Sequence, residues 1–131
     1  MDSKGKYEDF FNEHKRFFEG DSQKALFLEG VLVQKLLNIQ QQERNAQPFR
    51  SRLNSLKIDE KIARRLLPET INKLEEYEKN YYKKLEAEIS RYFLNSDLKK
   101  FSSDELSFYF VMGMNLANNF EKKEIKEEDN E

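Results

Sequence analysis

Residues 24–39, KALFLEGVLVQKLLNI, decide the fold because they cannot form a stable helix in solvent. On a wheel of 3.6 residues per turn, apolar side chains cover almost the whole circumference. They are Ala25, Leu26, Leu28, Leu32, Val33, Leu36, Leu37 and Ile39. The polar strip that remains is narrow and consists of Lys24, Gln34, Lys35 and Asn38. Other helices must surround such a helix, so we predict that it is the buried central helix of the protein.

Gly30 lies inside this predicted helix, where a glycine costs about 1 kcal/mol relative to alanine. We expect that another helix approaches closely at Gly30 and leaves no room for a side chain. Gly113 permits the same close packing in the last predicted helix.

The length and composition of the chain limit the classes of protein to which it can belong. Its 131 residues suffice for one domain with a usable core. The absence of cysteine excludes disulfides, thiolate zinc sites and cysteine nucleophiles. The N-terminal residues MDSKGKYEDFF lack the apolar region of a signal peptide, and no apolar run approaches the ~20 residues that span a bilayer. We therefore expect a soluble, cytoplasmic protein without a membrane partner.

Aromatic residues at helical spacing predict a first helix that packs its rings onto the central helix. They are Tyr7, Phe10, Phe11, Phe17 and Phe18, with His14 among them. Gly20 supplies the stop of this helix. Asp21 or Ser22 then offers an N-cap oxygen to the central helix, which we expect to run from about Gln23 to Arg44.

The middle of the chain predicts short helices whose starts are marked by cap residues and prolines. Pro48 opens a helix that ends at Asn54, with Phe49 facing inward. Asp59 caps a further short helix. Pro68 begins another, because its missing N–H matters least at a helix start.

Two more helices complete the prediction. Apolar residues three or four positions apart over 69–93 predict a long amphipathic helix, which a break near Asn80 can divide. Ser102 and Glu105 have the spacing of a capping box before a last core helix, which we expect to end near Asn119. The predicted fold class is all-α, a single compact bundle of about five to six helices around the buried central helix.

The C-terminal residues differ in composition from the rest of the chain. Residues 121–131, EKKEIKEEDNE, contain six acids, three bases and too little apolar surface to order themselves. We expect a helical bundle domain over residues 1–120 and a disordered acidic tail over residues 121–131.

The chain lacks the residue combinations on which most enzymes and metal sites depend. His14 is the only histidine, and packing or solvent exposure explains it more simply than catalysis. Without cysteine or a second histidine, the usual metal-ligand sets and nucleophile–histidine pairs cannot form. A solvated helix face accounts for the carboxylates of Glu75, Glu76, Glu78, Glu86 and Glu88. We predict no enzymatic activity, no cofactor, no metal and no small-molecule substrate.

One segment departs from the nearly neutral average of the chain. The whole chain has 23 Lys+Arg, 25 Asp+Glu and a net charge of -2, whereas residues 44–65 carry a net charge of +5. The bases are Arg44, Arg50, Arg52, Lys57, Lys61, Arg64 and Arg65. Arginine forks and the free N–H groups of helix starts both bind phosphate oxygens, so these seven residues are the candidate nucleic-acid-binding site. A solvated run of charges explains the same composition, and both interpretations stay open.

Four blocks of sequence, taken together, resemble a known family. They are KALFLEGVLVQKLLNIQ, PFRSRLNSLKIDEKIARRLLPE, KLEEY and ELSFYFVMGMNLA, in this order. Over about residues 17–117 the chain is similar to the C-terminal region of the large subunit of type I-B CRISPR Cascade complexes. A free-standing chain of this region resembles the separately produced small subunit of that complex.

The resemblance implies a non-catalytic all-α subunit of a crRNA-guided complex in antiviral defence. Its implied partners are the backbone and large subunits, copies of itself, the crRNA–target DNA hybrid and the displaced DNA strand. Such small subunits brace the complex and hold target DNA in the R-loop, while base pairing with the guide reads the sequence. The alternative from another class is a helical adaptor that binds only protein and makes no nucleic-acid contact.

Overall fold

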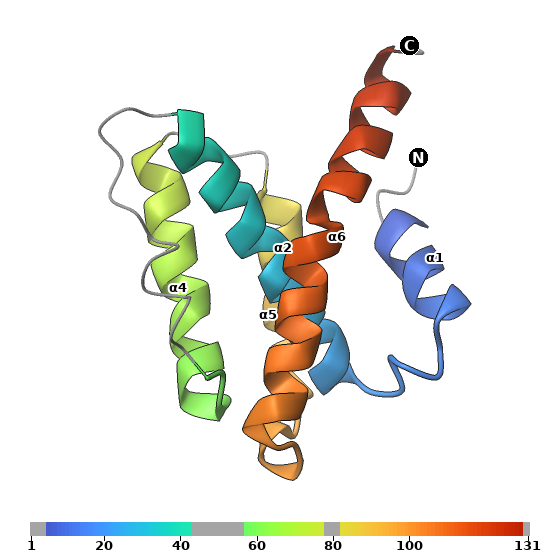
Figure 1. Cartoon of the computed structure of the whole chain (residues 1–131), viewed down its shortest axis with the longest axis vertical. Coiled ribbons are helices and arrows are strands. Elements are labelled where there is room, and N and C mark those ends of the chain that lie inside the picture. The colour runs from blue at the N-terminus through green and yellow to red at the C-terminus, as the bar shows by residue number, and fades with distance from the viewer. Residues whose placement is uncertain (1–4, 43–56, 78–81, 130–131) are drawn as a thin grey trace.

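The computed structural model describes residues 5–42, 57–77 and 82–129, and all regular elements in these ranges are helical. This confirms the predicted all-α bundle (Figure 1). The elements are α1 (Gly5–Glu13), α2 (Asp21–Gln42), α4 (Glu60–Glu76), α5 (Lys83–Leu94), the 3-10 turn η1 (Leu98–Lys100) and α6 (Ser103–Asp129). The predicted helix from Pro48 to Asn54, with Phe49, lies outside the described residues.

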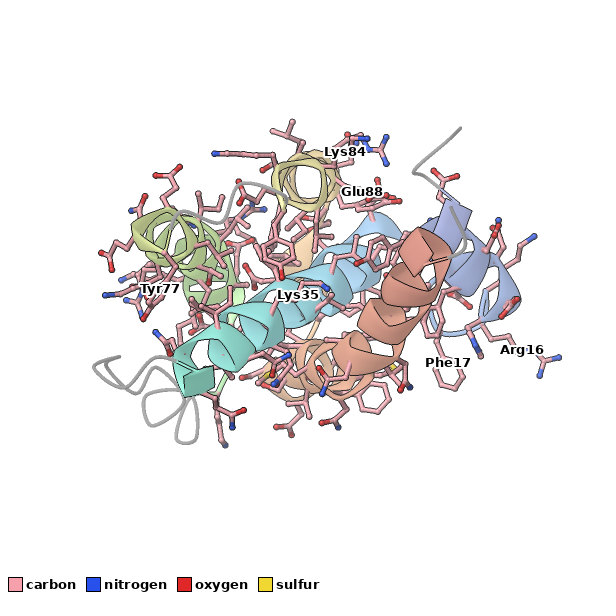
Figure 2. The ribbon with its side chains drawn as sticks, turned by 90° about the horizontal axis from the view of Figure 1, so that it is seen from above. Arg16, Phe17, Lys35, Tyr77, Lys84 and Glu88 are labelled. Carbon is pink, nitrogen blue, oxygen red and sulfur yellow. The ribbon has the colours of Figure 1, made fainter. Side chains whose placement is uncertain are left out.

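Helix α2 is the central helix, as the sequence predicts. All residues over 25–33 are buried, and the same holds for most of the residues that follow as far as Gln40. Figure 2 shows α1, α4, α5 and α6 around α2. The most extensive helix contact in the described part of the chain is that between α2 and α6. Burial on all sides therefore accounts for the apolar circumference of residues 24–39.

The start of α2 differs from the prediction. The helix begins at Asp21, so both predicted cap residues lie inside it. The N–H of Gly20 donates to Oε1 of Gln23 at 3.1 Å, which ties the first turn to the chain before it. The hydroxyl of Ser22 does not cap the helix but accepts a hydrogen bond of 2.9 Å from the N–H of Asp97.

Two glycines lie where α2 crosses α6. A β-carbon on Gly30 would collide with the main-chain carbonyl of Phe110. A β-carbon on Gly113 would collide with the carbonyl of Phe27 in the same way. Each glycine thus faces the backbone of the opposite helix, which confirms the close approach predicted at both positions.

Helix α1 is shorter than the aromatic pattern predicts. It ends at Glu13, and a turn follows in which the N–H of Phe17 donates to the carbonyl of His14 at 2.9 Å. Because the chain leaves the helix here, Phe17 points away from the bundle with 51% of its surface exposed (Figure 2). The expectation that Phe17 packs inward is therefore wrong. The neighbouring Phe18 is buried in a cluster of rings that also contains Tyr7, Phe10, Phe11, Phe27 and Phe120.

Helix α4 begins where the sequence predicts and runs through the proline. Oδ1 of Asp59 accepts a hydrogen bond of 2.8 Å from the N–H of Ile62, which confirms the cap. Pro68 lies inside α4 and does not start a new helix. Its side chain is exposed, so water can hydrate the carbonyl of Arg64, which has lost its helical partner. A proline on the wet face interrupts the hydrogen bonding of α4 without disturbing its buried face.

The amphipathic stretch predicted over 69–93, with a break allowed near Asn80, belongs to two helices in the structure. Helix α4 ends at Glu76, where the N–H of Tyr77 donates to the carbonyl of Leu74 at 3.2 Å. Helix α5 resumes at Lys83. The break that the sequence allows near Asn80 lies outside the described residues.

Helix α6 opens with the predicted capping box and ends later than predicted. The N–H of Ser102 donates to Oε1 of Glu105 at 3.0 Å, and the N–H of Glu105 donates to Oγ of Ser102 at 3.1 Å. The helix then continues to Asp129, so the predicted end near Asn119 is wrong and the backbone of the expected disordered tail is helical that far. Glu and Lys are good helix formers, and extending an existing helix needs no new nucleus. The division into a domain and a tail at residue 120 stays a prediction.

Candidate nucleic-acid interface

Four of the seven predicted site residues belong to the described part of the chain, at or near the first turns of α4. They are Lys57, Lys61, Arg64 and Arg65, and all four are exposed. Arg44, Arg50 and Arg52 lie outside the described residues.

The buried face of α4 decides how its cations point. Ala63, Leu66, Leu67, Thr70 and Leu74 are buried against the rest of the bundle. On the other side, Arg64 and Arg65 follow Lys61 by three and four positions, a spacing at which side chains begin about 5–6 Å from each other. We call these three residues the α4 cationic strip. The helix therefore presents three positive groups to solvent on the side away from its buried face.

Lys57 precedes the strip on a backbone that α6 holds in place. The N–H of Ile58 donates to Oγ of Ser107 at 3.0 Å, and Oγ of Ser103 donates to the carbonyl of Ile58 at 2.9 Å. The side chain of Ile58 is buried. These contacts join the start of α4 to the first turns of α6, so the backbone that carries Lys57 is fixed.

The two arginines of the strip are held differently. Nε of Arg65 lies 3.7 Å from Oε1 of Glu69 in an exposed pair, and such pairs contribute about 0–1 kcal/mol. Nη2 of Arg64 donates to Oγ of Ser96, beyond the end of α5, at 3.4 Å. The guanidinium carbon of Arg64 also lies 5.8 Å from the centre of the Phe93 ring. Both arginines keep N–H groups free for a ligand, because a guanidinium has five.

The charge of the described part of this surface is modest. Residues 57–69 contain four bases and three acids. Of the acids, Asp59 accepts the hydrogen bond that caps α4, and Glu69 forms an ion pair with Arg65. Most of the positive excess predicted for 44–65 therefore comes from the three arginines outside the described residues. In the part of the chain that the structure describes, no group of three or more His, Cys, Asp or Glu side chains is placed to hold a metal ion.

Three charged residues are buried although the sequence does not predict their burial, namely Lys35, Glu86 and Glu29. Lys35, assigned to the polar strip of the central helix, is only 2% exposed, with Nζ 5.3 Å from the centre of the Tyr82 ring. Glu86, assigned to a solvated face, is also buried, and this burial raises the pKa of its carboxyl while Lys83 opposes the rise. That assignment is wrong for Glu86 and holds for the exposed Glu75 and Glu76.

Glu29 is the most unusual of the buried groups. It lies in the middle of α2 with no exposed surface, and burial raises the pKa of its carboxyl well above the ordinary value. Among the described residues neither of its oxygens has a hydrogen-bond partner. Such surroundings favour the neutral form of the carboxyl, because a charged one would lose its hydration without compensation. Its position in the middle of the apolar segment 24–39 makes it unusual in the sequence, but the pattern does not show that the side chain is enclosed.

The partner of Arg64 could not have been found in the sequence. Ser96 lies 32 residues away from it, and no local pattern connects the two positions. A serine near a helix end ordinarily indicates only a turn or a cap. The contact exists because α4 and α5 pack side by side.

Among the described helices, none has the length and apolar composition that crossing a membrane requires. The comparison with protein families gives a match over nearly the whole chain. The model described as "CRISPR-associated protein TM1802 (cas_TM1802) C-terminal domain" matches residues 1–128. No curated protein and no solved structure matches the chain. The match covers nearly the whole chain and confirms the resemblance to a CRISPR-associated family. The chain therefore belongs to the family of the C-terminal domain of CRISPR-associated protein TM1802, and its role is in a CRISPR system.

Proposed function

We propose that this protein is a non-catalytic small subunit of a type I-B Cascade complex, which binds the backbone of target DNA and its displaced strand and so stabilises the R-loop. The observation that carries the proposal is the α4 cationic strip, exposed on a helix of a CRISPR-associated family member. The backbone and large subunits and further copies of this chain are its proposed protein partners.

The chemistry of the strip fits phosphate better than bases. Arginine and lysine side chains donate hydrogen bonds to phosphate oxygens and neutralise their charge. The exposed large aromatic side chains among the described residues, Phe17 and Phe108, lie outside α4, so the strip offers no surface for base stacking. Binding of this kind is independent of sequence, which suits a complex in which the guide RNA selects the target.

The test is the target-DNA affinity of Cascade complexes rebuilt with the variant Lys61→Glu/Arg65→Glu. We expect weaker binding to all targets and a smaller salt dependence, with the slope reduced by roughly 0.7 for each single-strand phosphate that the variant no longer neutralises. The matched control is Lys73→Glu/Lys84→Glu, which makes the same change of charge in the last turns of α4 and the first turn of α5. An unchanged dissociation constant and salt slope for the strip variant, in complexes that assemble normally, contradicts the proposal.

One observation favours the alternative, an adaptor that binds only protein. Residues 106–120 of α6 contain no charged residue, although 37% of the whole chain is charged. Phe108 and Val111, one turn apart on this stretch, are about half exposed, at 53% and 49%. An uncharged, partly apolar helix face suits a protein neighbour and offers nothing to phosphate.

The two functions predict different results for the same pair of variants. If the chain is only an adaptor, Phe108→Ser/Val111→Ser prevents its incorporation into the complex, and Lys61→Glu/Arg65→Glu changes nothing. If the chain binds DNA, the strip variant is incorporated and weakens target binding. Incorporation is measured by size-exclusion chromatography of the rebuilt complex.

A further inference from the structure

Arg64 differs from the other cations of the strip because a second helix holds it. Its Nη2 donates to Oγ of Ser96 at 3.4 Å, and its guanidinium lies 5.8 Å from the centre of the Phe93 ring. Lys61 and Arg65 extend from α4 with at most an exposed pair, that of Arg65 with Glu69, to restrain them. Arg64 is therefore the strip residue whose position depends on α5 as well as on α4.

The hydroxyl of Ser96 is itself fixed in the orientation that accepts from Arg64. Its proton goes to the carbonyl of Phe93, to which Oγ donates at 2.8 Å. A hydroxyl that has given its only proton can take part in further hydrogen bonds only as an acceptor. The backbone on either side is also secured, because the N–H of Ser96 donates to the same carbonyl at 3.2 Å and that of Asp97 donates to Ser22 at 2.9 Å.

The ring of Phe93 supports the guanidinium from the side of the bundle, in which it is buried. A guanidinium within about 6 Å of an aromatic ring centre is attracted to the ring face. One N–H of Arg64 is used by Ser96, so four remain for a ligand. Arg64 is exposed, so these donors are accessible to a ligand, and the two contacts restrict the rotation of the side chain.

We propose that Arg64 is the principal phosphate ligand of this surface and that Ser96 and Phe93 are positioning residues that preorganise it. The inference rests on the proposed DNA-binding function and adds that the site is built from two helices. Preorganisation strengthens binding because less side-chain entropy is lost when the phosphate arrives. Arg64 then contributes more to affinity than Lys61 or Arg65, although each carries the same charge.

The experiment compares rebuilt complexes carrying Ser96→Ala, Ser96→Thr and Arg64→Ala, with target DNA and a single-stranded oligonucleotide as probes. We expect Arg64→Ala to weaken binding about tenfold and Ser96→Ala about three- to fivefold, with Ser96→Thr close to wild type because the hydroxyl is kept. Only Arg64→Ala should reduce the salt slope, by roughly 0.7, because Ser96 itself contacts no phosphate.

The decisive measurement is the double variant Arg64→Ala/Ser96→Ala. If Ser96 acts through Arg64, the double variant binds as Arg64→Ala does, because nothing is left for Ser96 to position. A further loss of about three- to fivefold in the double variant, or no loss in Ser96→Ala alone, overturns the inference. The proposed function has a separate criterion, because Lys61→Glu/Arg65→Glu must weaken binding whether or not Ser96 matters. Urea unfolding of each free variant shows whether a loss of affinity follows from a loss of stability.

Discussion

Replacing Gly30 or Gly113 by alanine adds one methyl group at the point where α2 and α6 cross. The new β-carbon at residue 30 would collide with the carbonyl of Phe110, and that at residue 113 with the carbonyl of Phe27. Both obstacles are main-chain atoms of a helix, which cannot rotate away as a side chain can. The two helices must therefore move apart, or tilt, along the most extensive contact of the bundle.

Two opposing effects determine the size of the loss. Alanine is the better helix former, which favours each variant by about 1 kcal/mol. Overpacking of a well-packed core costs about 1–3 kcal/mol, and we take the upper limit because the backbone at the crossing cannot adapt. The expected net decrease in the free energy of unfolding is therefore about 2 kcal/mol for Gly30→Ala and for Gly113→Ala.

The assay is urea unfolding followed by circular dichroism, with Gly20→Ala as the control. A β-carbon at Gly20 would meet only the flexible end of Gln23, with Oε1 at 3.2 Å, so that variant should stay within about 0.5 kcal/mol of wild type. The double variant Gly30→Ala/Gly113→Ala should lose less than the sum of the single losses, because one methyl group already separates the helices for the other. If Gly30→Ala and Gly113→Ala are as stable as Gly20→Ala, the close crossing does not limit the packing of this bundle.

Three further variants test other parts of the structure. Leu32→Ala should cost about 2–5 kcal/mol in urea unfolding because this side chain is fully buried in α2, and a loss below ~1 kcal/mol would contradict the central position of the helix. Burial raises the pKa of Glu29, so on raising the pH the unfolded chain ionises first and the wild type loses up to ~1.4 kcal/mol per pH unit until the folded carboxyl also ionises. Glu29→Gln removes this slope, so its stability relative to wild type should rise as the pH increases above the ordinary pKa of a glutamate, and a constant difference would show that the carboxyl has ordinary surroundings. Truncation after Phe120 should lower the melting temperature little, because a polar acidic segment buries little surface, and a large loss would show that residues 121–129 pack against the bundle.

The sequence predicted those features of the fold that depend on residues close to one another in the chain. The apolar circumference of residues 24–39 needs no knowledge of the partners to require burial, and the Ser102–Glu105 box is complete within four residues. Gly30 is also informative, because a glycine inside a helix lowers the stability of that helix, and the close approach of another helix explains its presence. Each of these features would raise the free energy of an isolated helix, and a contact in the folded protein must offset that cost.

The features that the sequence did not predict depend on which helix face is exposed to solvent and on contacts between residues far apart in the sequence. Pro68 is tolerated inside α4 because its face is exposed, and propensity alone cannot show this. Glu29 and Lys35 interrupt an apolar pattern, and the pattern does not show whether a charged side chain escapes to water or is enclosed. In the candidate site, the composition identified Arg64 but not its support by Ser96, which only the packing of α4 and α5 produces.

The two exposed surfaces of the protein lie on different helices on either side of α2. Figure 2 shows α4, which carries the cationic strip, on one side of the central helix and α6, which carries the uncharged stretch, on the other. The glycines fix α6 against α2, and the hydrogen bonds of Ile58 join the start of α4 to α6. A bundle built in this way can hold DNA on one helix while a protein neighbour covers another, because the exposed side chains of α4 and α6 are not the ones that pack in the core. Substitutions on α4 and on α6 should therefore separate DNA binding from assembly, whereas substitutions at the glycine crossing should impair both together.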